Sequence, residues 1–129
     1  MSLYKGLDHI GVYTTDLQGS EDFYVKTLGF ELLSRQRATR ADGSEFGMCF
    51  VAAGSCEIEL VEVAELPASG VIAHIALEVE DIELAMATLK DKGVDFPTPY
   101  GEMSILGGIK NVFFSGPSGE RLELVQRLG

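Results

Sequence analysis

The 129-residue sequence predicts an α+β fold made of two tandem βαβββ modules. The segments "LDHIGVYTTDL" (7–17) and "IAHIALEVEDI" (72–82) share an apolar-x-His-Ile pattern, a strand-like run and a closing aspartate. The segments "GSCEIELV" (54–61) and "SGERLELV" (118–125) end in nearly the same four residues. In each half, a helical stretch followed by a glycine comes after the first of these segments. Self-similarity at a regular spacing indicates a duplicated structural unit.

The two modules are expected to form one domain over residues 1–129. Module 1 spans about 5–64, a linker reading "ELPASG" spans 65–70, and module 2 spans about 71–127. Apolar residues make up 46% of the sequence and charged residues 23%, which is ordinary for a globular protein. A chain of this length can bury a working core without disulfides or a structural metal.

Each module is expected to open with a strand and to contain three more. In module 1, period-two alternation places Leu7, His9 and Tyr13 on one face of the first strand and Ile10 and Val12 on the other. The later strand candidates lie at 30–36, 45–53 and 56–63 in module 1 and at 95–101, 108–115 and 120–126 in module 2.

One helix is expected in each module, after the first strand. Asp16 and Asp81 are well placed to cap these helices. Gly29 and Gly93 suit the left-handed conformation that commonly ends a helix. The helix of module 1 is less regular and is weakened by Gly19. The helix of module 2 has apolar residues at i, i+3, i+4 and i+7, namely Ile82, Ala85, Met86 and Leu89.

Charge and hydropathy exclude two classes of partner. The net charge of −10 argues against a nucleic-acid surface, which needs clustered cations. No apolar run approaches the roughly 20 residues that span a bilayer. The start lacks a basic region followed by an apolar one, so no signal peptide is expected and a cytoplasmic location is the default. Cys49 and Cys56 are then expected to be reduced, buried thiols on two arms of a hairpin.

Both histidines of the chain occupy equivalent positions in the repeat. A shift of 65 residues superposes His9 on His74. After one deletion, a shift of 64 superposes Glu59 on Glu123 and also superposes "MCFV" (48–51) on "VFFS" (112–115). Glu57 falls on an arginine under this shift, so the repeat selects Glu59 as the acid that pairs with Glu123.

Two imidazoles and two carboxylates around one point would suit one divalent ion such as Zn, Ni, Co, Mn or Fe. The predicted metal ligands are therefore His9, Glu59, His74 and Glu123. The alternative is that the histidines are half-buried packing residues and the glutamates are exposed strand carboxylates. The recurrence of all four residues in a repeat favours the metal site.

Three segments resemble the vicinal oxygen chelate superfamily, which has the glyoxalase I and bleomycin-resistance fold. They are "DHIGVYTTDLQGSEDFYVKTLGFEL" (8–32), "HIALEVEDIELAMATLKDKGV" (74–94) and "GGIKNVFFSGPSGERLELV" (107–125). The last carries Gly116-Pro117-Ser118-Gly119 where the family usually has Asp-Pro-Asp-Gly. The resemblance covers nearly the whole chain. It implies paired βαβββ modules that form a cupped mixed sheet around a central metal site.

The ligand pattern most resembles that of glyoxalase I (lactoylglutathione lyase), which has His, Glu, His and Glu. Carried over, these are His9, Glu59, His74 and Glu123. Related epimerases commonly have Gln at the second place. Fosfomycin-resistance enzymes and extradiol dioxygenases have a triad without that acid, and bleomycin-binding members usually lack the metal set.

The resemblance implies a metal-dependent lyase or isomerase that moves a proton next to a carbonyl through a metal-bound enediolate. The substrate would be a small carbonyl compound or a thiohemiacetal, with Glu123 as main base and Glu59 as its pseudo-symmetric partner. A homodimer is also expected, because family members often dimerise.

Two departures from bacterial glyoxalase I leave the thiol open. Tyr13 stands where that family has the Arg used for glutathione, and no Asn follows "IEL" in "IELVEVAEL". The alternatives are an isomerase like methylmalonyl-CoA epimerase and a non-enzymatic small-molecule binding protein.

Substrate contacts are expected from three places. The arginines of "RQRATR" (Arg35, Arg37 and Arg40) could hold an anionic group or form a solvated loop. The segment 101–110 could be a loop over the site or an ordinary connection. Four side chains could line the pocket or belong to the core: Tyr13, Met48, Phe50 and Phe114.

Overall fold

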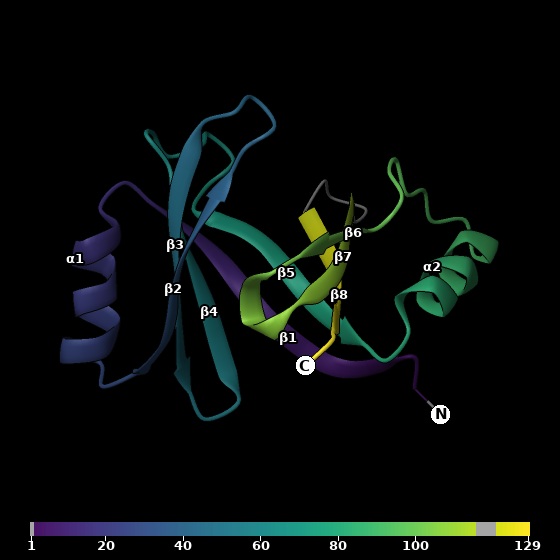
Figure 1. The fold of residues 1–129 in the computed structure, drawn as a ribbon, viewed down its shortest axis with the longest axis horizontal. Coiled ribbons are helices and arrows are strands. Elements are labelled where there is room, and N and C mark those ends of the chain that lie inside the picture. Colours follow the sequence, from purple (N-terminus) through teal and green to yellow (C-terminus); the bar gives the residue numbers. More distant parts are fainter. Residues whose placement is uncertain (1, 116–120) are drawn as a thin grey trace. The chain divides into compact units, whose positions relative to one another are not determined.

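The computed structural model describes residues 2–115 and 121–129, and the chain divides into two compact units (Figure 1). The His9 unit comprises His9–Ala73, and the His74 unit comprises Met1–Asp8 together with His74–Gly129. The division therefore falls directly before each of the two histidines. The segment 116–119, which carries part of the family resemblance, lies outside the described residues.

The first module has the predicted strand-helix-strand-strand-strand order. Its strands are β1 (Tyr4–Thr14), β2 (Glu31–Thr39), β3 (Glu45–Ala53) and β4 (Cys56–Glu62), in the sheet order β2-β3-β4-β1. β1 and β4 are parallel, and the other two pairs are antiparallel. β1 contributes its last six residues to the His9 unit and its first five to the His74 unit.

The second module repeats this arrangement. Its strands are β5 (Ile72–Val79), β6 (Gly101–Met103), β7 (Ile109–Ser115) and β8 (Arg121–Arg127), in the order β5-β8-β7-β6. β5 and β8 are parallel, as β1 and β4 are. The α+β fold with paired βαβββ modules is confirmed.

The helices confirm the predicted caps. The Asp16 side chain accepts a hydrogen bond from the Gly19 amide at the start of α1 (Leu17–Asp22), and Asp81 accepts one from Leu84 at the start of α2 (Ile82–Asp91). α1 continues as a π-helical turn, η1 (Phe23–Thr27). Gly29 and Gly93 follow the helices with φ of +81° and +95°, a region that other residues rarely adopt.

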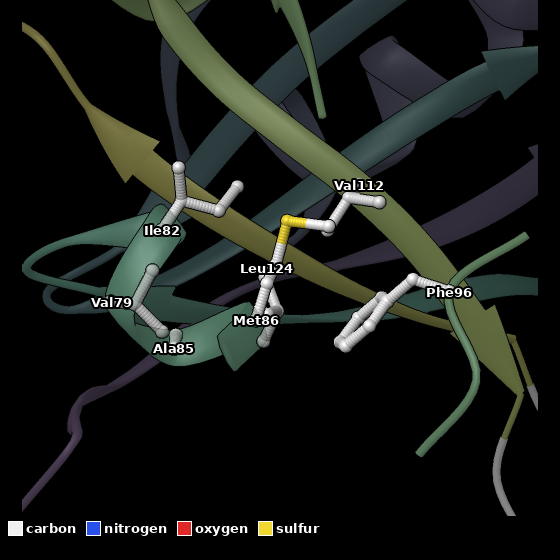
Figure 2. Close-up of a cluster of buried hydrophobic side chains, with 7 residues drawn as sticks. All are labelled: Val79, Ile82, Ala85, Met86, Phe96, Val112 and Leu124. Carbon is white, nitrogen blue, oxygen red and sulfur yellow. The ribbon is translucent and has the colours of Figure 1, made fainter. Parts of the chain in front are cut away.

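Each unit has its own apolar core. In the His74 unit, seven buried side chains pack between α2, β7 and β8 (Figure 2): Val79, Ile82, Ala85, Met86, Phe96, Val112 and Leu124. In the His9 unit, Cys49, Val51 and Leu60 are buried against side chains of α1 and η1, including Leu17 and Tyr24. These packed helices leave the opposite face of each sheet to His9 or His74.

Two predictions of local structure are wrong. The segment 95–101 does not form a strand, because Pro97 and Pro99 lack the N–H that a ladder needs; β6 begins only at Gly101. Cys56 is exposed rather than buried, while Cys49 is buried, and both thiols are free.

In the part of the chain that is described, no helix has the length and apolarity needed to cross a bilayer.

Candidate metal centre

In the His9 unit, His9 and Glu59 form a buried pair. His9 lies on β1 and Glu59 on β4, with 2% and 6% of their surfaces exposed. The parallel ladder pairs Gly11 with Glu59, which places the acid beside the imidazole on the same face. The Nε2 atom of His9 lies 3.4 Å from Oε1 of Glu59. The Phe50 ring meets the His9 ring edge-on, with centroids 5.6 Å apart.

The His74 unit contains the same arrangement. His74 on β5 and Glu123 on β8 are 8% and 3% exposed. The ladder pairs Ala76 with Glu123, the counterpart of the pairing of Gly11 with Glu59. The Nε2 atom of His74 lies 3.3 Å from Oε1 of Glu123. The Phe113 ring meets the His74 ring edge-on, also at 5.6 Å.

The geometry of each pair fits two ligands of one divalent ion. Ligands bound at about 2.1 Å with an angle of about 90–110° lie about 3.0–3.4 Å apart. The two Nε2–Oε1 distances, 3.4 Å and 3.3 Å, fall at the upper end of that range. Imidazole nitrogen with carboxylate oxygen is the donor mixture that borderline divalent metals accept. The residues present therefore fit such an ion.

Glu123 has an amide partner that the sequence analysis did not find. The Nδ2 atom of Asn111, on β7, donates to Oε2 of Glu123 at 3.0 Å and lies 3.8 Å from Sδ of Met103. Asn111 pairs with Val125 in the ladder, so its side chain lies diagonally from Glu123 on the same face. Only the strand register reveals this contact.

The register also corrects the sequence alignment. Phe50 pairs with Glu59, whereas the residue that pairs with Glu123 is Phe113, not Phe114. Phe114 instead packs on Phe96 in the α2 core, with ring centroids 5.2 Å apart, so it does not lie on the His74 face. Glu59 follows its phenylalanine by nine positions and Glu123 by ten, a difference that the shift of 64 concealed.

An acid next to His9 in sequence anchors the first strand. Asp8 is 4% exposed and accepts hydrogen bonds from Nε and Nη2 of Arg127 at 2.9 and 3.0 Å. Both residues belong to the His74 unit. A two-bond arginine–carboxylate contact fixes direction as well as distance. It therefore fixes the last residue of β1 before His9.

The arginine cluster lies on β2 and in the turn after it, not in a solvated loop. Arg35 donates to both oxygens of Glu21 at 2.8 and 2.7 Å. Through these hydrogen bonds Arg35 lowers the pKa of Glu21 below its ordinary value of 4.5. Arg37 lies 3.6 Å from the carboxylate of Glu45.

The third member, Arg40, donates to the Glu62 carbonyl at 2.7 Å and stacks over the Phe46 ring. Each of the three side chains thus has a different protein partner. Within the His9 unit, Arg35 and Arg37 line a cavity of about 510 Å³ together with Glu21 of α1.

The segment 101–110 contains regular structure. It includes β6 and a 3₁₀ turn, η2 (Ile105–Gly107), before β7 begins. Leu106 has φ of +55° inside this turn and is followed by Gly107 and Gly108, which also have positive φ. The turn therefore combines backbone conformations that cost a non-glycine residue about 1 kcal/mol or more.

Two βαβββ modules, each with one buried His–Glu pair, define the class: a duplicated α+β protein whose two His–Glu pairs are candidate ligands of a divalent metal ion. Comparison with known families agrees. The model described as the Glyoxalase/Bleomycin resistance protein/Dioxygenase superfamily matches residues 6–124, and the chain therefore belongs to this superfamily. The family predicted from the sequence is confirmed.

The chain is 32% identical over 126 residues to the uncharacterized protein YwbC of Bacillus subtilis (strain 168), with 95% of this chain and 98% of that protein covered. Its fold is similar to that of methylmalonyl-CoA epimerase from Mycobacterium tuberculosis (TM-score 0.79, 21% identity, 100% and 92% covered). It is also similar to hypothetical protein BH1468 from Bacillus halodurans C-125 (TM-score 0.76, 24% identity, 95% and 94% covered). At these identities, the two structures establish the shared fold.

Proposed function

We propose that this protein is a divalent-metal-dependent isomerase or lyase that moves a proton on the carbon next to a carbonyl group. The observation that carries the proposal is the repeated buried pair, with a histidine Nε2 beside a glutamate Oε1 at 3.4 Å in one unit and 3.3 Å in the other. Buried ionisable groups of this kind are costly without a partner. Two matching pairs therefore favour a functional centre over packing.

The four side chains divide into ligands and proton carriers. His9, Glu59, His74 and Glu123 would hold the ion. When bound, the ion supplies Lewis-acid stabilisation of negative charge on the substrate oxygen. A glutamate at such a centre can take a proton from carbon and return it to a neighbouring atom, because its carboxylate lies in a water-poor site beside the substrate. Glu123 is assigned as the main base in this proposal, and Glu59 as its pseudo-symmetric partner.

Two substrate classes remain in the proposal. The fold of the mycobacterial methylmalonyl-CoA epimerase supports acyl-thioester epimerisation. The acid at the second ligand position, Glu59, supports a thiohemiacetal, as in the lactoylglutathione lyase pattern. Both reactions begin with the same abstraction of a proton next to a carbonyl. A purely sequestering role is less well supported, because it needs no His–Glu pair.

The test begins with metal content and affinity. Calorimetric titration of the purified, chelator-treated protein with Zn²⁺, Ni²⁺ and Co²⁺ should give a single class of site. The His9→Ala and His74→Ala variants should each bind the ion at least about 100-fold more weakly. Losing a residue that only orients a ligand costs up to about 100-fold in affinity, and losing the ligand itself should cost at least as much. A wild-type protein without specific metal binding would overturn the proposal.

The second step tests the reaction. The metal-loaded protein should exchange the proton next to the carbonyl with D₂O, either in an acyl-CoA or in the adduct of methylglyoxal with a thiol. Glu59→Gln and Glu123→Gln should reduce this exchange by about 100-fold or more, typical for a general base. Glu57→Gln is the matched control on the same strand and should retain the exchange. If the metal-loaded protein exchanges the proton of neither substrate class, the proposed enzymatic activity is refuted and only metal binding is retained.

A further inference from the structure

We infer that Asn111 is a positioning residue that fixes which oxygen of Glu123 faces the metal. This inference rests on the proposed function, since it assigns a role to a residue outside the four ligands. The observation is that the two carboxylate oxygens of Glu123 have different neighbours. Oε1 lies 3.3 Å from Nε2 of His74, and Oε2 accepts a hydrogen bond from Nδ2 of Asn111 at 3.0 Å.

The orientation of the Asn111 amide follows from the chemistry around it. If the amide oxygen faced Glu123, two acceptors would meet in a largely buried place, which is unfavourable. The nitrogen has two hydrogens, and Nδ2 lies 3.0 Å from Oε2 of Glu123 and 3.8 Å from Sδ of Met103. The amide is thus held from two sides, by β8 and by β6.

A carboxylate held in this way has lost most of its freedom to rotate. Because Oε2 is held by the amide, Oε1 is left on the side of His74 and is ready to act as a single-oxygen ligand. A preorganised ligand binds a metal more tightly, because less side-chain entropy is lost on binding. The hydrogen bond from Asn111 also disfavours binding of the ion by both oxygens of Glu123.

The His9 unit has a methionine at the position equivalent to Asn111. Met48 pairs with Val61 in the β3–β4 ladder as Asn111 pairs with Val125 in the β7–β8 ladder, so the two residues occupy equivalent positions. A thioether has no N–H to donate. At this ladder position, only the second module has an amide that can donate to the glutamate. The proposed metal centre is therefore not fully symmetric.

The test removes the donor while keeping the size of the side chain. In Asn111→Leu, calorimetry should show Zn²⁺ or Co²⁺ affinity about 10–100-fold weaker than in the wild type, the usual effect of losing a partner that orients a ligand. The visible absorption spectrum of the Co²⁺-loaded variant should also change, because Glu123 becomes free to bind through both oxygens. Met48→Leu is the matched control in the His9 unit and should change the affinity by less than about threefold, below the range expected for an orienting contact.

A second variant guards against misfolding. Asn111→Met introduces the residue that the first module has at this position, and it should show the same loss of affinity and the same spectral change. Wild-type affinity and an unchanged Co²⁺ spectrum in both variants would overturn the role of Asn111 while leaving the metal centre in place. If the wild type itself binds no ion, the proposed function fails instead, so the two failures are distinguishable.

Discussion

The two units share a strand register but differ in what covers the sheet. In both, the parallel strand pair places a glutamate beside a histidine on one face. On the other face, the His74 unit has the apolar cluster under the ten-residue α2 (Figure 2). The His9 unit has a smaller apolar cluster, Cys49, Val51 and Leu60, under the six-residue α1, and Glu21 of this helix contacts Arg35 and Cys49. The repeated His–Glu arrangement thus depends on strand pairing, which is the same in both units, while the helical layers differ.

The largest expected effect compares the two cores at equivalent positions. Leu60 and Leu124, on β4 and β8, are 1% and 0% exposed. Replacing either by alanine should lower the free energy of unfolding by about 2–5 kcal/mol, because each leaves a cavity in a packed cluster. Urea unfolding followed by circular dichroism measures both. The control is Leu84→Ala, on the exposed face of α2, which should change stability by less than about 0.5 kcal/mol.

A loss below about 1 kcal/mol for one of the two leucines would show that its cluster contributes little to stability. That outcome would break the comparison, because it would mean that only one unit has a core that holds the fold. Similar losses in both would show that the two different helical layers support their sheets equally well.

A smaller effect is expected where the His9 unit departs from the apolar pattern. Glu21 is 6% exposed, and Arg35 lowers the pKa of its carboxyl below 4.5. A lowered folded-state pKa gives stability that is present above about pH 4.5 and is lost as the pH falls below it. Arg35→Met should lower the melting temperature at pH 7 by about 2–5 °C. The difference from the wild type should shrink below pH 4.5.

The control for this prediction lies two residues further along the same strand. Arg37 contacts Glu45 at 3.6 Å, and both side chains are more than half exposed, so Arg37→Met should leave the melting temperature nearly unchanged. Equal melting temperatures for Arg35→Met and the wild type across this pH range would contradict a stabilising role for the ion pair.

The last prediction concerns the reactivity of the two thiols, where the smallest effect is expected. Burial, with the contact to Glu21, raises the pKa of Cys49 to about 12, and its side chain has no exposed surface. Cys56 is exposed. At pH 8 a thiol reagent such as Ellman's should therefore label one cysteine per native chain and two per unfolded chain, because only an accessible thiolate reacts. Cys56→Ser should abolish native labelling, and labelling that persists in this variant would show that Cys49 is accessible.

The elements with strong local signals could be predicted from the sequence. Asp16 and Asp81 cap their helices through their own side chains, so four consecutive residues contain the signal. The apolar face of α2 follows from spacing alone. The segment 95–101 was predicted wrongly because its aromatic residues suggest a strand, while its two prolines oppose the ladder. The π-helical turn η1 has no comparable sequence signal.

The candidate site was predictable to the extent that the repeat encodes it. His9, Glu59, His74 and Glu123 follow from two superposed segments, and the structure places each histidine beside the glutamate of its own module. That all four side chains bind one ion stays a prediction. Asn111 could not be found in this way, because its counterpart is a methionine and its contact depends on the β7–β8 register.

The contact of Asp8 with Arg127 has a consequence for biosynthesis. Its partners are 119 positions apart, one on the first strand and one on the last. At a synthesis rate of about 5–20 residues per second, Arg127 is added to the chain several seconds or more after Asp8. A nascent chain can therefore pair β2, β3 and β4 early, but β1 gains this anchor only when β8 has left the ribosome.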